Sequence, residues 1–479
     1  MAFDAQDLVY RTPFDYTSKR KNRSRYSLLH KNGQIKNILI HGTPYILTID
    51  EKNRLQVLRN QSVYIEDGII KDIFPASDSE KVDWSKVDLI YDAEQHGGIV
   101  ITPGFVNAHA HPPMYLLRGA IVMMEDDLGL ALKAMAKLEG RMTYDDFVIG
   151  TVGDLTEQQK SGITTTVSHY GTFEPIEEAA KICQQRVINA ISAASNSHPK
   201  NTPALISRYA KNQEKYYSQP AAAIHYTYRA SPAQLKKIAE VVNKYKLLFT
   251  LHVAETEKSV AQCIEVHGDR PIAVLDRYKL LHKKTLLSHG VHLTPEEIKL
   301  IKKRQAAVVH LPTSNFLHKS GRFNYPLFCK LKANSQIALG TDSVVSKNRL
   351  DLLSEALQTK TMHQSERIVS YTELFNVITA QGARLIGEPR LGRIAKGYKA
   401  DIAFWKLKDR GFMPFDENKP ATLIANMITH GGRNIRDLMI NGQFVISNRM
   451  HNLVDESSLI QNLQTAHMEL RAKDNKKKN

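Results

Sequence analysis

Hydrophobic and polar positions change their pattern twice along the 479-residue chain. Between residues 37 and 74 the apolar residues form short runs, and Asp67-Gly68 gives a turn signal between two of them, which predicts antiparallel strands. From about residue 100 to residue 340, β-branched runs alternate with helical stretches such as 232–245 and 295–304. Strand-like sequence returns after residue 400, with a second turn signal at Asn441-Gly442. The two chain ends therefore predict one small β domain with an α/β region inserted in it.

The central region predicts a barrel. Strands that alternate with helices form βαβ units and a parallel sheet, and eight of them over roughly 250 residues are typical of a (β/α)8 TIM barrel. The eight apolar runs lie at 100–108, 164–168, 187–194, 223–228, 247–253, 285–291, 306–311 and 336–340. We therefore expect an α/β fold in which the barrel is inserted in a composite β-sandwich domain.

The same pattern predicts the domain boundaries. We expect an N-terminal extension over 1–36, a β-sandwich domain from 37–100 and 388–450, a barrel from 101–387, and a C-terminal helix with a basic tail over 451–479.

Composition narrows the compartment and the partners. The chain has 42% hydrophobic and 24% charged residues, an ordinary mixture for a soluble protein, and it has no apolar run long enough to span a bilayer. The N-terminus lacks the pattern of a signal peptide, and three widely spaced cysteines argue against a disulfide framework, so we expect a cytoplasmic protein. The formal net charge of +16 would suit an anionic substrate or nucleic acid. Because the basic residues are scattered outside 19–25 and 473–478, we expect no nucleic-acid partner.

His109-Ala110-His111 is the first candidate for chemistry, at the end of the apolar run 99–107. Residues two apart on a strand share a face, so both imidazoles can bind one metal ion. Chance alone gives roughly one His-x-His in a chain with this many histidines, so the motif needs support from elsewhere.

That support comes from polar residues that end later strands. The catalytic residues of a TIM barrel lie at the carboxyl ends of its strands, so side chains at several such ends should meet. The candidates are Leu251-His252-Val253-Ala254-Glu255, Ser288-His289-Gly290 and Gly340-Thr341-Asp342-Ser343.

These motifs, in this order, resemble the amidohydrolase superfamily over about residues 37–445. The resemblance is to its chlorohydrolases, its S-adenosylhomocysteine/methylthioadenosine deaminases and its guanine deaminases. It is carried by Pro103-Gly104-Phe105-Val106-Asn107-Ala108-His109-Ala110-His111, Leu116-Leu117-Arg118-Gly119, His252-Val253-Ala254-Glu255-Thr256, Ser288-His289-Gly290-Val291, His310-Leu311-Pro312-Thr313-Ser314-Asn315, Gly340-Thr341-Asp342-Ser343, and Gly397-Tyr398-Lys399-Ala400-Asp401.

The resemblance implies a site with one divalent metal ion, zinc or alternatively ferrous iron. We find no lysine placed to bridge a second metal through a carbamate. The implied ligands are His109, His111, His252 and Asp342.

The resemblance also implies catalytic and substrate-binding residues. Asp342 and Glu255 would move protons, and His289 would contact the attacking water or the oxyanion, or else orient a neighbour. His225 and Asn315 would contact substrate.

Several further positions keep two readings. Arg118 would contact substrate or fix its loop, and His310 and His318 would line the pocket or be structural. The segment His225-Tyr226-Thr227-Tyr228 departs from the family's common His-Ala-Pro-Tyr spelling, so the substrate cannot be carried over from a relative.

The implied activity is metal-dependent hydrolysis of a C–N bond: deamination of an amino-substituted heteroaromatic ring such as a purine, nucleoside or pterin. A chlorohydrolase or a cyclic-amide hydrolase with the same site is the alternative. A remote alternative from another class is a non-catalytic nucleic-acid-binding or scaffold protein. We expect a small heterocyclic substrate, a homo-oligomer and no membrane partner.

Overall fold

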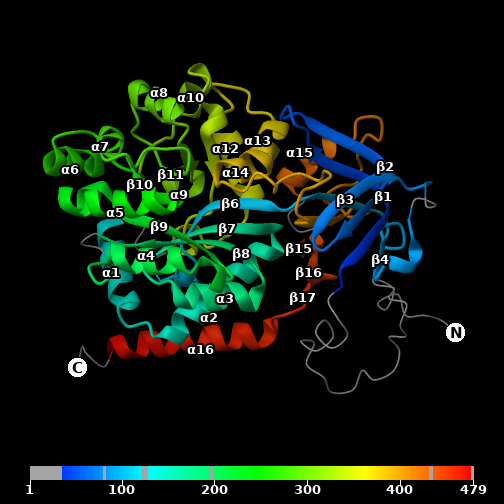
Figure 1. Ribbon diagram of the computed structural model, residues 1–479, viewed down its shortest axis with the longest axis horizontal. Helices are drawn as coiled ribbons and strands as arrows, with labels where there is room; N and C mark the ends of the chain where they lie inside the picture. The colour runs from blue at the N-terminus through cyan, green and yellow to red at the C-terminus, as the bar shows by residue number, and fades with distance from the viewer. Residues whose placement is uncertain (1–34, 79–81, 121–127, 195–197, 431–434, 476–479) are drawn as a thin grey trace.

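The chain forms a barrel and a separate sheet, side by side (Figure 1). The computed structural model describes residues 35–78, 82–120, 128–194, 198–430 and 435–475. The predicted extension over 1–36 lies outside the described residues, apart from its last two.

The barrel consists of eight strands, each hydrogen-bonded in parallel to the next in chain order. They are β6 (Phe105–Ala110), β7 (Ile163–Tyr170), β8 (Arg186–Ser192), β9 (Gln219–Tyr226), β10 (Phe249–Val253), β11 (Thr285–His289), β12 (Ala307–His310) and β13 (Ile337–Leu339). The predicted TIM barrel is confirmed.

The barrel closes between its first and last strands. There β6 and β13 are joined by an isolated parallel bridge between Ala110 and Asp342, and the Asp342 N–H donates to the His109 carbonyl at 3.0 Å. A Cβ at Gly340 would lie 2.9 Å from the same carbonyl oxygen, so glycine permits this close approach. We call this junction the β6–β13 seam.

Helices surround the barrel (Figure 1). Two of them show how local sequence sets their ends: α5 and α8 begin with a capping box at Ser231 and Thr294, each followed by proline, and they span the ranges predicted from periodicity. The helices are α1 (Leu128–Glu139), α2 (Tyr144–Lys160), α3 (Glu174–Cys183), α4 (Pro203–Lys211), α5 (Pro232–Tyr245), α6 (Glu257–His267), α7 (Pro271–Arg277), α8 (Pro295–Arg304), α9 (Pro312–Leu317), α10 (Tyr325–Lys330), α11 (Val344–Lys347), α12 (Leu352–His363), α13 (Tyr371–Ile378), α14 (Ala380–Leu385), α15 (Thr422–Thr429) and α16 (Glu456–Asn475).

The second sheet takes strands from both chain ends, as predicted. Its strands pair in the order β17-β16-β15-β14-β5-β1-β2-β3, with β4 also on β1. One cluster of buried side chains includes residues from β1 to β5 and from β14 to β16, so the sheet curves around a common core. The strands are β1 (Asn37–Ile49), β2 (Leu55–Glu66), β3 (Ile69–Pro75), β4 (Leu89–Asp92), β5 (Ile99–Pro103), β14 (Ile402–Lys406), β15 (Ile435–Ile440), β16 (Gln443–Ser447) and β17 (Met450–His451).

The first predicted barrel strand, 100–108, is divided in the structure. Its first part is β5, which pairs with β1 and β14 of the second sheet, and its second part is β6 of the barrel. Pro103-Gly104, a turn signal inside the run, lies at this change of sheet, whereas burial gives no sign of it because both parts are fully buried. The domain boundaries themselves remain a proposal.

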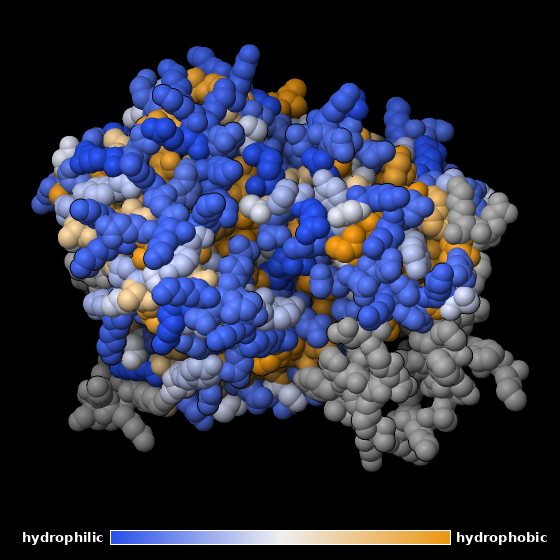
Figure 2. Space-filling model, in the orientation of Figure 1, coloured by the Kyte–Doolittle hydropathy of each residue, from blue (hydrophilic) through white to orange (hydrophobic). Residues whose placement is uncertain are grey.

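The C-terminal helix α16 lies along the barrel beside α2 (Figure 1). Just before it, His451 Nε2 hydrogen-bonds to the Gln159 side chain at 2.7 Å, which ties the end of the second sheet to α2. The face in Figure 2 is largely hydrophilic, with smaller hydrophobic patches. None of the helices in the described part of the chain has the length and apolar character needed to cross a bilayer.

Candidate metal centre

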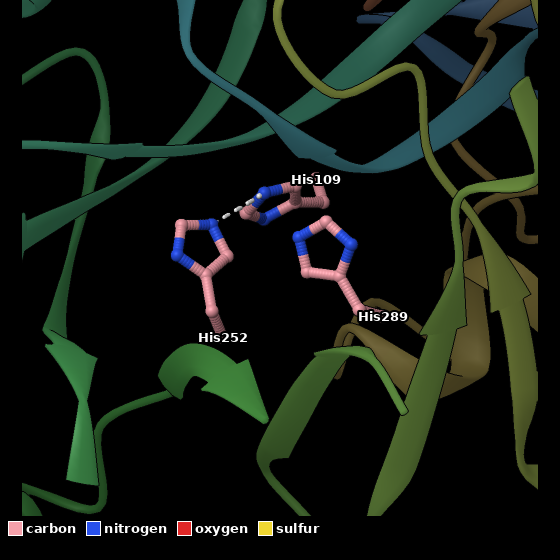
Figure 3. A group of neighbouring side chains, drawn as sticks. All are labelled: His109, His252 and His289. Atoms are coloured by element: carbon pink, nitrogen blue, oxygen red, sulfur yellow. Dashed lines mark hydrogen bonds between the residues drawn. The ribbon is translucent and has the colours of Figure 1, made fainter. Parts of the chain in front are cut away.

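Histidines from separate barrel strands converge at the carboxyl ends of those strands (Figure 3). The Nε2 atoms of His109 and His111 lie 3.1 Å apart. The Nε2 atom of His252 lies 3.3 Å from each of them. Asp342, beyond β13, places Oδ1 3.3 Å from His111 Nε2 and 3.7 Å from His109 Nε2. The four residues predicted as ligands therefore lie together.

These separations fit one bound cation. A tetrahedral zinc ion with nitrogen ligands at about 2.0–2.1 Å sets neighbouring ligand atoms about 3.3 Å apart. Three Nε2 atoms this close cannot all be paired by hydrogen bonds to one another, since the Nε2 atom of a neutral ring is either a donor or an acceptor. A donor set of nitrogen and carboxylate oxygen without thiolate suits zinc or iron(II). The described residues thus include a group that could hold a divalent metal ion.

Hydrogen bonds to the Nδ1 atoms of His109 and His111 fix which ring nitrogen faces the centre. His111 Nδ1 lies 2.6 Å from the His169 carbonyl oxygen, which only accepts, so Nδ1 carries the proton and Nε2 keeps its lone pair. His109 Nδ1 lies 2.9 Å from Ser288 Oγ. The Ser314 hydroxyl donates to Asp342 Oδ2, which leaves Oδ1 toward the histidines.

The charges of the site are compatible with a bound cation. Burial lowers the pKa of His109 and His252 well below the ordinary value, so these rings are neutral, as ligands must be. Burial alone would raise the pKa of Asp342, but the hydrogen bond with His111 and the nearby imidazoles hold it well below its usual range. Burial likewise disfavours a charged His111, yet the Asp342 carboxylate raises its pKa. With His109 and His252 neutral, the ionised Asp342 has its positive partner in a protonated His111 or, when His111 acts as a ligand, in a bound cation.

The backbone at these strand ends is unusual. Ala254, His289 and Asp342 have φ values of 45°, 73° and 56°, in the left-handed region that residues with a Cβ seldom adopt. Such conformations cluster at functional sites, where surrounding contacts hold them in place.

The candidate acid/base residues lie beside the histidines. Glu255 follows β10 and places Oε2 3.7 Å from His289 Nε2. His289 Nδ1 lies 2.8 Å from Asn315 Oδ1, and because an amide oxygen only accepts, that nitrogen carries the proton. The Nε2 atom of His289 therefore faces Glu255. Asn315 is fully buried and its amide oxygen contacts the ring of His289, while its predicted contact with substrate stays a prediction.

The other residues predicted to contact substrate differ in how close they lie to the centre. His225, at the end of β9, lies against the His252 ring with centroids 5.1 Å apart, so it borders the centre. Arg118 instead pairs with Glu157 of α2 and stacks over Tyr115 at 4.3 Å. These contacts favour the role of fixing its loop. His310 is fully buried and stacks on Phe323 at 4.4 Å.

Sequence reasoning missed several residues of the site. His169 ends β7, and its ring lies 4.9 Å from the His252 ring and 5.7 Å from the His109 ring. The rule that found the other histidines, a polar residue at a strand end, would have found it. Ser288 and Ser314 lie in motifs that carry the resemblance, but the sequence predicts no role for them, because their partners come from distant strands.

Comparisons with known proteins agree with this geometry. A sequence model described as the amidohydrolase family matches residues 100–445. A 5-methylthioadenosine/S-adenosylhomocysteine deaminase from Pyrococcus furiosus is 31% identical over 415 residues, which cover 83% of this chain and 93% of the relative.

Solved structures show the same fold. An adenosine deaminase from Xanthomonas campestris with bound zinc superposes with a TM-score of 0.80 at 24% identity, covering 91% of this chain and 98% of that one. An atrazine chlorohydrolase from Arthrobacter aurescens, complexed with zinc, gives a TM-score of 0.78 at 18% identity, with coverages of 90% and 100%.

Proposed function

The chain belongs to the amidohydrolase family, and from that premise we propose that it removes the amino group of an amino-substituted heteroaromatic ring by hydrolysis. An adenine nucleoside is the first substrate to test. The family and the class of enzyme, a hydrolase acting on C–N bonds, are confirmed. The adenine nucleoside is proposed because the matched relative is named a methylthioadenosine and adenosylhomocysteine deaminase.

One observation carries the proposal: four donors from β6, β10 and the end of β13 lie within 3.7 Å of a neighbour, beside a glutamate. We propose His109, His111, His252 and Asp342 as the ligands of one divalent ion, zinc in the first instance and iron(II) as the alternative. The chemistry that such an ion supplies is a lowered pKa of a water molecule, so that the water attacks as hydroxide near neutral pH.

The side chains around the ion would direct the protons. Glu255 would take one proton from the attacking water and deliver it to the ring nitrogen, and the second proton of that water would reach the leaving amine by way of Asp342. His289 would use Nε2 to hydrogen-bond the attacking water or the developing oxyanion. Asp342 would accept a proton from the same water while its Oδ2 stays bound to Ser314.

Ammonia release tests the reaction. The purified protein, loaded with zinc or iron(II), is assayed against adenosine, methylthioadenosine, adenosylhomocysteine, guanine and an amino-substituted pterin. The proposal expects ammonia in equal amount to the deaminated product from at least one of them. Chloride release from a chlorotriazine, or ring opening of a cyclic amide without ammonia, would instead favour the alternative hydrolases.

Metal analysis tests the ligands. We expect one equivalent of metal in the wild type and its loss in His252→Ala. Full occupancy in that variant would show that the ligand assignment is wrong. The cytoplasmic location and the homo-oligomer stay predictions, and light scattering on the purified protein tests the second.

A further inference from the structure

Tyr226 is the last residue of β9 and lies beside the candidate acid/base residue. It occupies the position where the family's common spelling has alanine, and the sequence pattern predicts no role for it. In the structure its hydroxyl donates a hydrogen bond to Glu255 Oε2. The Nε2 atom of His289 lies 3.7 Å from the same oxygen, beyond direct hydrogen bonding.

The ring of Tyr226 is held from several sides. It lies 4.6 Å from the His225 ring and 5.2 Å from the His252 ring, centroid to centroid. On a further side it stacks with Tyr228 at 5.1 Å and an interplanar angle of 28°. A ring enclosed in this way cannot swing its hydroxyl away from Glu255 without displacing a neighbour, so the donor is fixed before substrate arrives.

We propose that Tyr226 is a positioning residue that anchors Oε2 of Glu255 and leaves Oε1 free to carry the proton. The inference rests on the proposed function, because it assigns Glu255 the proton transfer. A carboxylate without such an anchor rotates about its terminal bond, and proton transfer needs its oxygen within about 2.6–3.2 Å of the reacting atom. The anchor therefore acts on the reaction through geometry and makes no contact with the reacting atoms.

Tyr226→Phe removes the hydroxyl and keeps the stacked ring. We expect kcat to fall about 10- to 100-fold, the range for one hydrogen bond to a charged group, while KM changes less than about twofold. Metal content should equal that of the wild type.

Tyr91→Phe is the matched control. Tyr91 is fully buried and donates to Asp437 Oδ2 at 2.6 Å in the second sheet, far from the barrel mouth. This variant loses a hydroxyl–carboxylate bond of the same kind, so it should lose stability but keep kcat. An unchanged kcat in Tyr226→Phe overturns the inference, and so does a raised KM with unchanged kcat, which would make Tyr226 a substrate contact.

A second measurement does not depend on turnover. In protein labelled with carboxyl-¹³C glutamate, the Glu255 signal is assigned by its loss in Glu255→Gln. It should move in Tyr226→Phe and stay in place in Tyr91→Phe. A signal that does not move overturns the inference whatever the activity. A moved signal in a protein that releases no ammonia would overturn the proposed function while the anchor of Glu255 stands.

Discussion

A buried ion pair beneath the site gives the sharpest test of how the structure is stabilised. Lys347 at the end of α11 pairs with Glu355 of α12, and their side chains are only 3% and 2% exposed. Glu355 also accepts hydrogen bonds from the N–H and the hydroxyl of Thr313, at 3.2 and 2.9 Å, in the first turn of α9. One carboxylate thus holds three segments together.

Glu355→Gln keeps the size of the side chain and the ability to accept from Thr313, but it leaves the Lys347 ammonium buried without a counter-charge. Breaking a buried pair in this way costs about 3–5 kcal/mol. Asp276→Asn is the surface comparison: Asp276 pairs with Arg304, which is 45% exposed, at 2.6 Å, and loss of an exposed pair costs less than about 1 kcal/mol.

Urea unfolding followed by circular dichroism and tryptophan fluorescence measures both losses, provided that the two transitions coincide. Lys347→Met combined with Glu355→Leu should recover at least half of the loss, because an apolar pair of similar volume removes the buried charge and leaves only the Thr313 donors unpaired. A Glu355→Gln variant within about 1 kcal/mol of the wild type would refute the reasoning, since it would mean that water reaches Lys347.

Three further predictions follow from other contacts. Chelation should abolish activity and lower the melting temperature, and zinc or iron(II) should restore both; calorimetry with and without added metal checks this. Ser288→Ala should weaken metal binding about 10- to 100-fold, because Ser288 orients His109, and competition with a metal indicator measures it. Burial lowers the pKa of His451 to about 4. Between about pH 6.5 and pH 4, His451 therefore binds a proton in the unfolded chain but not in the folded chain. The free energy of unfolding should therefore fall by up to about 3 kcal/mol over that interval, and urea titrations of wild type and His451→Gln isolate this part.

Each of these has an outcome that contradicts it. Activity that survives complete removal of metal would exclude a metal-dependent reaction. Unchanged affinity in Ser288→Ala would show that the ring of His109 is held by packing alone. An equal pH dependence in His451→Gln and the wild type would place the protonation elsewhere; His363, whose pKa burial also lowers to about 4, is the next candidate.

Much of the barrel could be predicted because its signal is local. Each strand is a short buried run, and capping boxes such as that of Ser231 mark where helices begin. Pro103-Gly104 marks the division between β5 and β6, but the sheet that each part joins could not be predicted, because a fully buried strand has the same pattern in either sheet.

In the candidate site, too, local features could be predicted from the sequence and contacts between distant strands could not. His109, His111, His252 and Asp342 could be found because a strand end is visible in sequence. The contacts of Tyr226 and Ser314 with their carboxylates could not, because they depend on which strands become neighbours and how each side chain is turned.

The β6–β13 seam has a consequence for the route by which the barrel comes apart. Across it, His109 and His111 stand on the first strand and Asp342 follows the last, with an isolated bridge and one N–H···O contact joining the backbones beside them. An ion shared by these side chains would hold the first and last strands together at the join where an isolated bridge takes the place of a regular strand ladder. Removal of the ion should therefore loosen the barrel along this join, with amide exchange becoming faster first in β13 and in the end of β6, while β8 and β9, which do not border the join, keep their protection. The same ion would take part in catalysis and stabilise the closure of the barrel.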